Sequence, residues 1–111
     1  KKTGIYPVNH ILVVKSELAT SHPWILGELF AVFKASKERY LEHLNTNGPL
    51  SAEDELRLRL KAIVGGDPLP YGLPSNRKAI EALAQFSFEQ ALLPKLFTIE
   101  ELFDFPVMLL E

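Results

Sequence analysis

The chain has 111 residues, 47% of them hydrophobic and 23% charged, a balance typical of one folded globular domain rather than of a disordered chain. Its 12 basic and 14 acidic side chains give a formal net charge of −2, so no basic surface exists to neutralise the phosphates of a nucleic acid. The chain contains no cysteine, which excludes disulfides and cysteine-bound metals. Its longest apolar run, Leu29–Phe33, is far shorter than the ~20 residues that a membrane span needs.

The first element that the sequence predicts is a strand over about residues 8–15. Valine and isoleucine dominate the run that follows His10, and apolar residues occupy both alternating faces, as in a strand buried inside a sheet. No other stretch of the chain predicts a strand, yet an interior strand needs hydrogen-bonding neighbours on both edges. We therefore expect these neighbours to come from the N-terminal remainder of a longer protein or from a second copy. A different conformation of this segment is the alternative. The absence of a methionine at Lys1 agrees with the first of these expectations.

Four helices are predicted after the strand, over about residues 22–46, 52–64, 76–92 and 99–104. Ser21 is the expected N-cap of the first, and Gly48 is expected to end it in a left-handed conformation. Capping boxes at Ser51–Asp54 and Thr98–Glu101 begin the second and fourth, and Ser75 or Asn76 is expected to cap the third. The expected fold is a mainly α chain, residues 1–111, with one N-terminal strand followed by about four helices.

Four sequence elements occur in an order that resembles a known family. They are T-G-I-Y-P-V-N-H at residues 3–10, H-P-W at 22–24, G-D-P-L-P-Y-G-L at 66–73 with N-R-K at 76–78, and E-E-L-F at 100–103. Together they resemble the C-terminal portion of 4,5-dihydroxyphthalate decarboxylase-like proteins, which are similar in fold to the type II periplasmic solute-binding proteins of ABC transporters. The resemblance implies an α/β parent with two lobes and a ligand cleft between them. It also implies removal of one carboxylate from a small aromatic dicarboxylate.

Candidate site residues lie at the start of the predicted strand. His10 is the candidate proton donor and ligand-binding residue, because histidine exchanges protons near neutral pH. Tyr6 and Asn9 are candidate ligand contacts, by stacking on a ring and by hydrogen bonding to a carboxylate. Asn9 departs from the methionine that the resemblance leads us to expect. For all three residues, packing and turn hydrogen bonds are the alternative role.

Residues after the proline-rich loop have a predominantly structural interpretation. Tyr71 is expected to hold this loop, Asn76 to cap a helix, and Arg77 to pair with an acidic residue, although an arginine near a helix N-terminus is also able to bind an anion. The three histidines lack the spacing of metal ligands, so no metal site is expected. No glycine-rich nucleotide motif occurs, and no cofactor is evident.

Three functions remain open from the sequence. The chain is part of an aromatic decarboxylase, part of a solute-binding protein for a small anionic ligand, or a helical interaction and dimerisation module. The isolated strand favours the first two, because it requires a sheet. The enzyme would be cytoplasmic and the solute-binding protein periplasmic, so localisation also stays open.

Overall fold

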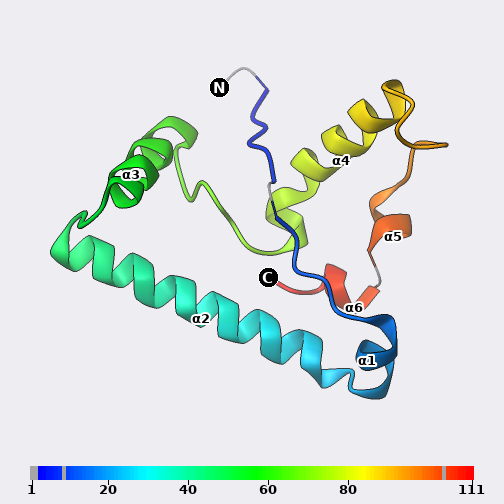
Figure 1. Ribbon diagram of the computed structural model, residues 1–111, viewed down its shortest axis with the longest axis horizontal. Helices are drawn as coiled ribbons and strands as arrows, with labels where there is room; N and C mark the ends of the chain where they lie inside the picture. Colours follow the sequence, from blue (N-terminus) through cyan, green and yellow to red (C-terminus); the bar gives the residue numbers. More distant parts are fainter. Residues whose placement is uncertain (1–2, 9, 104) are drawn as a thin grey trace. The chain divides into compact units, whose positions relative to one another are not determined.

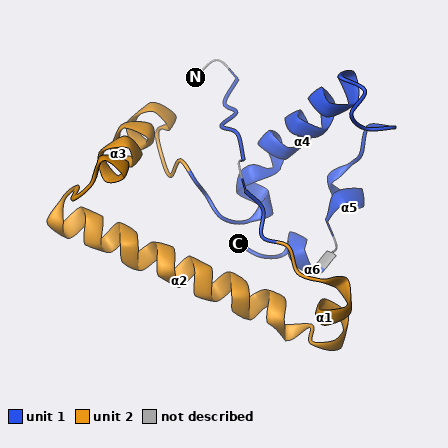
Figure 2. Cartoon of the chain, viewed as in Figure 1, with its two compact units in different colours: residues 1–12, 69–111 blue, residues 13–68 orange. Residues whose placement is uncertain are grey.

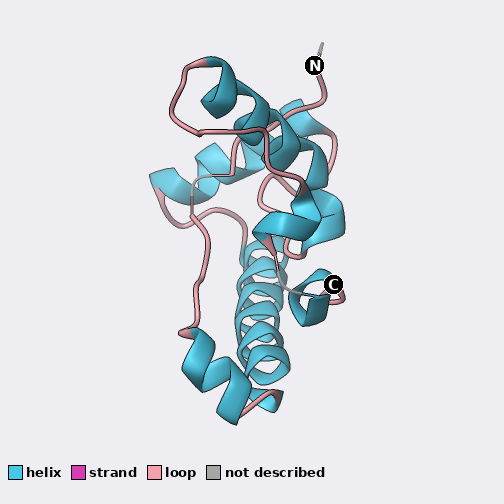
Figure 3. Cartoon of the chain, turned by 90° about the vertical axis from the view of Figure 1, so that its right-hand side faces the viewer, coloured by secondary structure: helices cyan, strands magenta, loops and turns pink. Residues whose placement is uncertain are grey.

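The structure is a computed structural model that describes residues 3–8, 10–103 and 105–111. These residues form helices and connecting loops without any strand, which confirms the prediction of a mainly helical chain (Figure 3). The chain divides into two compact units, Lys1–Leu12 with Leu69–Glu111 and, separately, Val13–Pro68 (Figure 2). The helices labelled in Figure 1 are α1 (Ser16–Ser21), α2 (Trp24–Asn47), α3 (Ala52–Val64), α4 (Leu73–Glu89), α5 (Ile99–Leu102) and α6 (Phe105–Met108).

The unit Val13–Pro68 contains the long helix α2, close to where the sequence predicts one. Its C-terminus is at Gly48, where φ is 74° and the backbone N–H donates to the carbonyl oxygen of Leu44 over 2.9 Å. A positive φ is accessible to glycine at little cost, so the predicted stop at this residue is confirmed. The N-terminus differs from the prediction, because Pro23 precedes the first helical residue and Ser21 instead ends α1.

Helix α3 begins at the predicted capping box. The amide of Asp54 donates to Ser51 Oγ, and the amide of Ser51 donates to Asp54 Oδ2, each over 3.1 Å. Asp54 also accepts a hydrogen bond from the Tyr40 hydroxyl on α2. This bond is the largest cause of a raised pKa at Tyr40 and of a lowered pKa at Asp54. One carboxylate therefore caps α3 and ties it to α2.

The unit that contains both termini is organised around a small apolar core. Leu73 and Ile80 of α4 and Ile99 of α5 are buried together. Val8, from the N-terminal segment, packs against this cluster, as do Phe103 and Met108. Helix α4 contacts both short helices, α5 and α6. The N-terminal segment is therefore held in place through Val8.

Helix α4 ends in a Schellman motif whose left-handed residue is alanine. The amide of Leu92 donates to the carbonyl oxygen of Ser87, and that of Ala91 to Phe88, each over 2.9 Å. Ala91 has φ 58°, a conformation that glycine usually supplies at this position. The sequence predicts an end near residue 92 on account of Pro94, whereas the helix ends at Glu89.

Replacing Ala91 by glycine is expected to raise the free energy of unfolding by about 1 kcal/mol, because the left-handed conformation costs a residue with a Cβ atom roughly this much. Ala82→Gly inside α4 is the matched control, and it is expected to lower stability by about 1 kcal/mol. Hydrogen exchange of the α4 amides in the complete polypeptide, measured at increasing urea concentrations, gives both changes. Changes of the same sign would contradict a left-handed Ala91.

The described residues between 8 and 15 form no strand within this chain, in contrast to the prediction. Ile11, Leu12 and Val13 are instead 54%, 61% and 82% exposed. Helix α1, which the sequence did not predict, follows directly from Lys15, whose carbonyl oxygen accepts the amides of Leu18 and Ala19 over 3.0 Å. A strand is stabilised by hydrogen bonds to its neighbours, and no described residue supplies them to Ile11–Val14.

Candidate functional site

The candidate ligand-binding residues of the N-terminal segment lie on either side of a core contact. Val8 packs on the core of α4 and α5, Tyr6 is half-buried, and His10 is exposed. Neither Tyr6 nor His10 forms a hydrogen bond or ion pair with another described residue. Asn9 lies outside the described residues. The polar atoms of Tyr6 and His10 are thus available to a ligand, and Val8 anchors the segment that carries them.

A tight turn precedes Tyr6. Gly4 has φ 66°, and the amide of Ile5 donates to Thr3 Oγ1 over 3.3 Å. Lys78, from α4, reaches this turn, because its Nζ atom lies 3.2 Å from the place that a Cβ atom at Gly4 would occupy. In the sequence, Lys78 stands out only as part of the N-R-K triplet. Gly4 and Lys78 are far apart in the sequence, so no sequence motif indicates that they are close together in the folded chain.

Asn76 connects α4 to the proline-rich loop. Its Nδ2 atom donates to the carbonyl oxygen of Pro70 over 2.7 Å and to that of Gly72 over 2.8 Å. The expected helix N-cap at Ser75 or Asn76 is wrong, because α4 begins at Leu73 with Gly72 as its N-cap residue. Pro74 is compatible with this earlier start, since a proline in the first turn removes an amide that has no helical partner. Tyr71, in the same loop, is 41% exposed.

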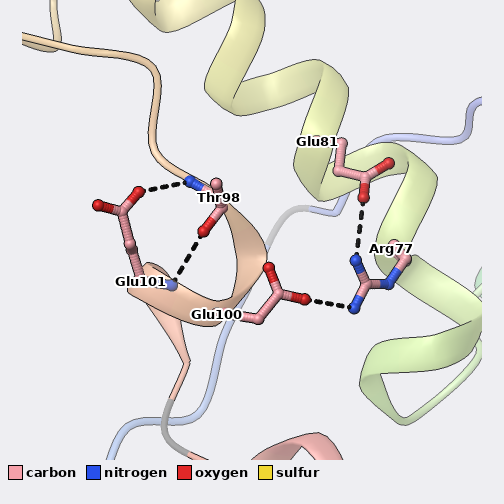
Figure 4. Close-up of polar contacts among 5 residues, drawn as sticks. All are labelled: Arg77, Glu81, Thr98, Glu100 and Glu101. Atoms are coloured by element: carbon pink, nitrogen blue, oxygen red, sulfur yellow. Dashed lines mark hydrogen bonds and ion pairs between the residues drawn. The ribbon is translucent and has the colours of Figure 1, made fainter.

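Arg77 bridges two acidic residues rather than projecting freely into solvent (Figure 4). Its guanidinium group donates to Glu100 Oε1 over 3.0 Å and to Glu81 Oε1 over 3.2 Å. These hydrogen bonds, that of Glu100 first, raise the pKa of Arg77. The pKa of Glu100 is lowered by a backbone hydrogen bond and then by Arg77. The positive charge of Arg77 is therefore compensated by residues of the chain.

The capping box at Thr98 fixes the start of α5 beside this bridge (Figure 4). The amide of Thr98 donates to Glu101 Oε2 over 2.9 Å, and the amide of Glu101 donates to Thr98 Oγ1 over 3.3 Å. Lys95 binds the same carboxylate, and this hydrogen bond is the largest cause of a lowered pKa at Glu101. The second predicted capping box is confirmed, and Ile99 and Glu100 take their places from it.

The contacts of the other two histidines, His22 and His43, are with residues close to them in the sequence. His22 Nδ1 lies 2.9 Å from Ser21 Oγ, and His43 Nδ1 lies 3.0 Å from Asn47 Nδ2. Within the described ranges, no group of histidine and acidic residues has an arrangement that would hold a metal ion. No described helix combines the length and the apolar character that crossing a bilayer requires.

Comparison with known proteins gives one curated relative. The chain is 29% identical over 86 residues to a protein described as 4,5-dihydroxyphthalate decarboxylase from Comamonas testosteroni. The match covers 73% of this chain but only 26% of the relative, so the chain spans about a quarter of that protein's length. No protein-family model matches the chain. No solved structure matches it either. The likeness indicates distant relatedness.

Proposed function

We propose that the chain is the C-terminal portion of a decarboxylase-like protein that acts on a dihydroxylated aromatic dicarboxylate. The observation that carries this proposal is the likeness to the Comamonas testosteroni protein, whose description as 4,5-dihydroxyphthalate decarboxylase agrees with the family that the sequence motifs resemble. The local geometry is compatible with it. His10, which forms no hydrogen bond with another described residue, and the half-buried Tyr6 belong to one segment that Val8 anchors.

The proposed reaction breaks the bond between the ring carbon and one carboxylate, which leaves as CO₂. The electron pair of that bond stays on the ring carbon, which then takes up a proton. His10 is the proposed donor, since a positioned histidine is the most common general acid in proteins, and it regains its proton from water. Stabilisation of the electron pair before protonation falls to residues outside this chain.

We further propose that Ile11–Val14 pairs with strands of the remainder of a longer polypeptide. The apolar character of both faces and the exposure of Ile11, Leu12 and Val13 support this pairing. The relative also supports it, since about three-quarters of its length lies outside the match. In this arrangement His10 would lie at the amino-terminal end of a sheet strand, in the segment that Val8 anchors.

The test is turnover of 4,5-dihydroxyphthalate by the complete polypeptide that the gene encodes. We expect release of CO₂ together with one equivalent of the dihydroxylated monocarboxylate, both measured against time, and no release from benzoate. Calorimetric titration of the same protein separates binding from chemistry. Tight binding without CO₂ release would contradict the proposed reaction and would assign a solute-binding role instead.

A further inference from the structure

The turn at Gly4 brings together groups that are suited to a carboxylate. The Lys78 ammonium lies against the turn, and the hydroxyl of Thr3 accepts from the amide of Ile5, which leaves its own proton available for donation. Thr3, Gly4 and Lys78 are exposed to solvent, and all three belong to the same compact unit. An anion placed here would receive hydrogen bonds from a cation and from a neutral donor.

The charge of Lys78 distinguishes it from its neighbour. Arg77 forms ion pairs with Glu81 and Glu100. Lys78 forms no ion pair with any residue that the structure describes, although the chain carries more acidic than basic side chains. A lysine whose charge is not compensated locally is the better candidate for binding an external carboxylate, because no existing ion pair has to be broken first.

We propose that Lys78 and the Thr3–Gly4 turn form a subsite for one carboxylate of the aromatic ligand. This inference rests on the proposed function and extends it, since it names the group that binds the charge. Tyr6 follows Gly4 by two residues, so their Cα atoms are at most about 7 Å apart. A carboxylate on Lys78 therefore places an attached aromatic ring within reach of the half-buried Tyr6 side chain.

Glycine at position 4 has a defined role in this subsite. A side chain there would need a positive φ, which is unfavourable, and its Cβ atom would lie 3.2 Å from Lys78 Nζ. Gly4→Ala is therefore expected to strain the turn and to shift the ammonium slightly, without removing its charge. This variant tests the position of the charge, whereas Lys78→Gln tests the charge itself.

The experiment measures dissociation constants for the complete polypeptide with 4,5-dihydroxyphthalate, phthalate and the aliphatic dicarboxylate succinate. Lys78→Gln is expected to weaken binding of all three by about tenfold, the effect of losing one charge-assisted hydrogen bond. Lys78→Arg retains the charge and is expected to recover part of this loss. The matched control is Lys61→Gln on α3, which removes the same charge in the other unit and is expected to leave binding unchanged.

A merely electrostatic or structural role for Lys78 predicts a different pattern. Equal effects of Lys78→Gln and Lys61→Gln would overturn the subsite, as would unchanged affinity in both Lys78→Gln and Gly4→Ala. Absence of binding by all three dicarboxylates would overturn it as well. If 4,5-dihydroxyphthalate binds equally well to the wild type and to Lys78→Gln, the subsite is overturned and the proposed function is not. Succinate binding that depends on Lys78, without affinity for 4,5-dihydroxyphthalate, would support the subsite and contradict the proposed function.

Discussion

His10→Ala in the complete polypeptide is expected to lower kcat for 4,5-dihydroxyphthalate by about tenfold or more, because a positioned general acid contributes on the order of 10²–10⁴ in rate. The carbon that loses CO₂ must take up a proton, and His10 is the candidate donor that this chain supplies. His10 is exposed and has no described hydrogen-bond partner, so its removal should leave the core of its unit intact. Steady-state measurement of kcat and KM, with product quantified by chromatography, gives the result.

The control for this prediction is His43→Ala, which removes a histidine on α2 that contacts Asn47. This change is expected to leave both constants near the wild-type values. A loss confined to KM in His10→Ala would make His10 a ligand contact rather than a proton donor. Unchanged kcat and KM would remove it from the site altogether.

Ile99→Ala is expected to destabilise the unit that contains α4, α5 and α6 by about 3 kcal/mol. Ile99 is 2% exposed and packs with Leu73 and Ile80, so truncation removes apolar contacts and leaves a cavity. Such substitutions typically cost about 2–5 kcal/mol. Because this core is small, the loss should open the whole cluster. Hydrogen exchange measured by mass spectrometry locates it, and we expect faster exchange in α4.

The matched control lies on the same short helix. Leu102 is 44% exposed, so Leu102→Ala removes a similar side chain that has less buried apolar surface. It should lower the free energy of unfolding by less than about 1 kcal/mol. The two variants differ in burial but share α5 and its capping box. Similar exchange rates in both would mean that Ile99 does not hold this core together in solution.

Helix boundaries were predictable where a local interaction determines them. Ser51 with Asp54, and Thr98 with Glu101, form both halves of their capping boxes within four consecutive residues, so the sequence alone contains the information. Gly48 ends α2 for an equally local reason.

Boundaries that depend on distant or atypical contacts were missed. Asn76 does not cap α4, because the helix begins at Leu73 and the Asn76 side chain donates to the carbonyl oxygens of Pro70 and Gly72. The helix ends at a left-handed alanine, Ala91. The pattern at Ile11–Val14 indicates a strand, but strand formation requires hydrogen-bonding partners that no described residue provides.

The candidate site was predictable only in part. Residue type and the resemblance indicate His10 and Tyr6, and neither forms a hydrogen bond with another described residue. Lys78 was not predicted, because its proximity to Gly4 arises from folding between distant positions. For Arg77, helical spacing suggests Glu81 as a partner, since residues four apart are neighbours on a helix. Glu100 lies on another helix, so only the fold brings it to Arg77.

The exposed Ile11–Leu12–Val13 run also affects the solubility of this polypeptide when it is produced alone. Uncharged, β-branched residues with free backbone amides and carbonyls are the usual starting point for fibril growth between identical molecules. Pro7 and the charged Lys15 flank the run, and both residue types oppose such stacking. Because Ile11, Leu12 and Val13 are exposed in spite of these flanking residues, expression of the isolated chain is expected to yield insoluble material rich in intermolecular cross-β structure. Co-expression with a polypeptide that covers this run should keep the chain dissolved.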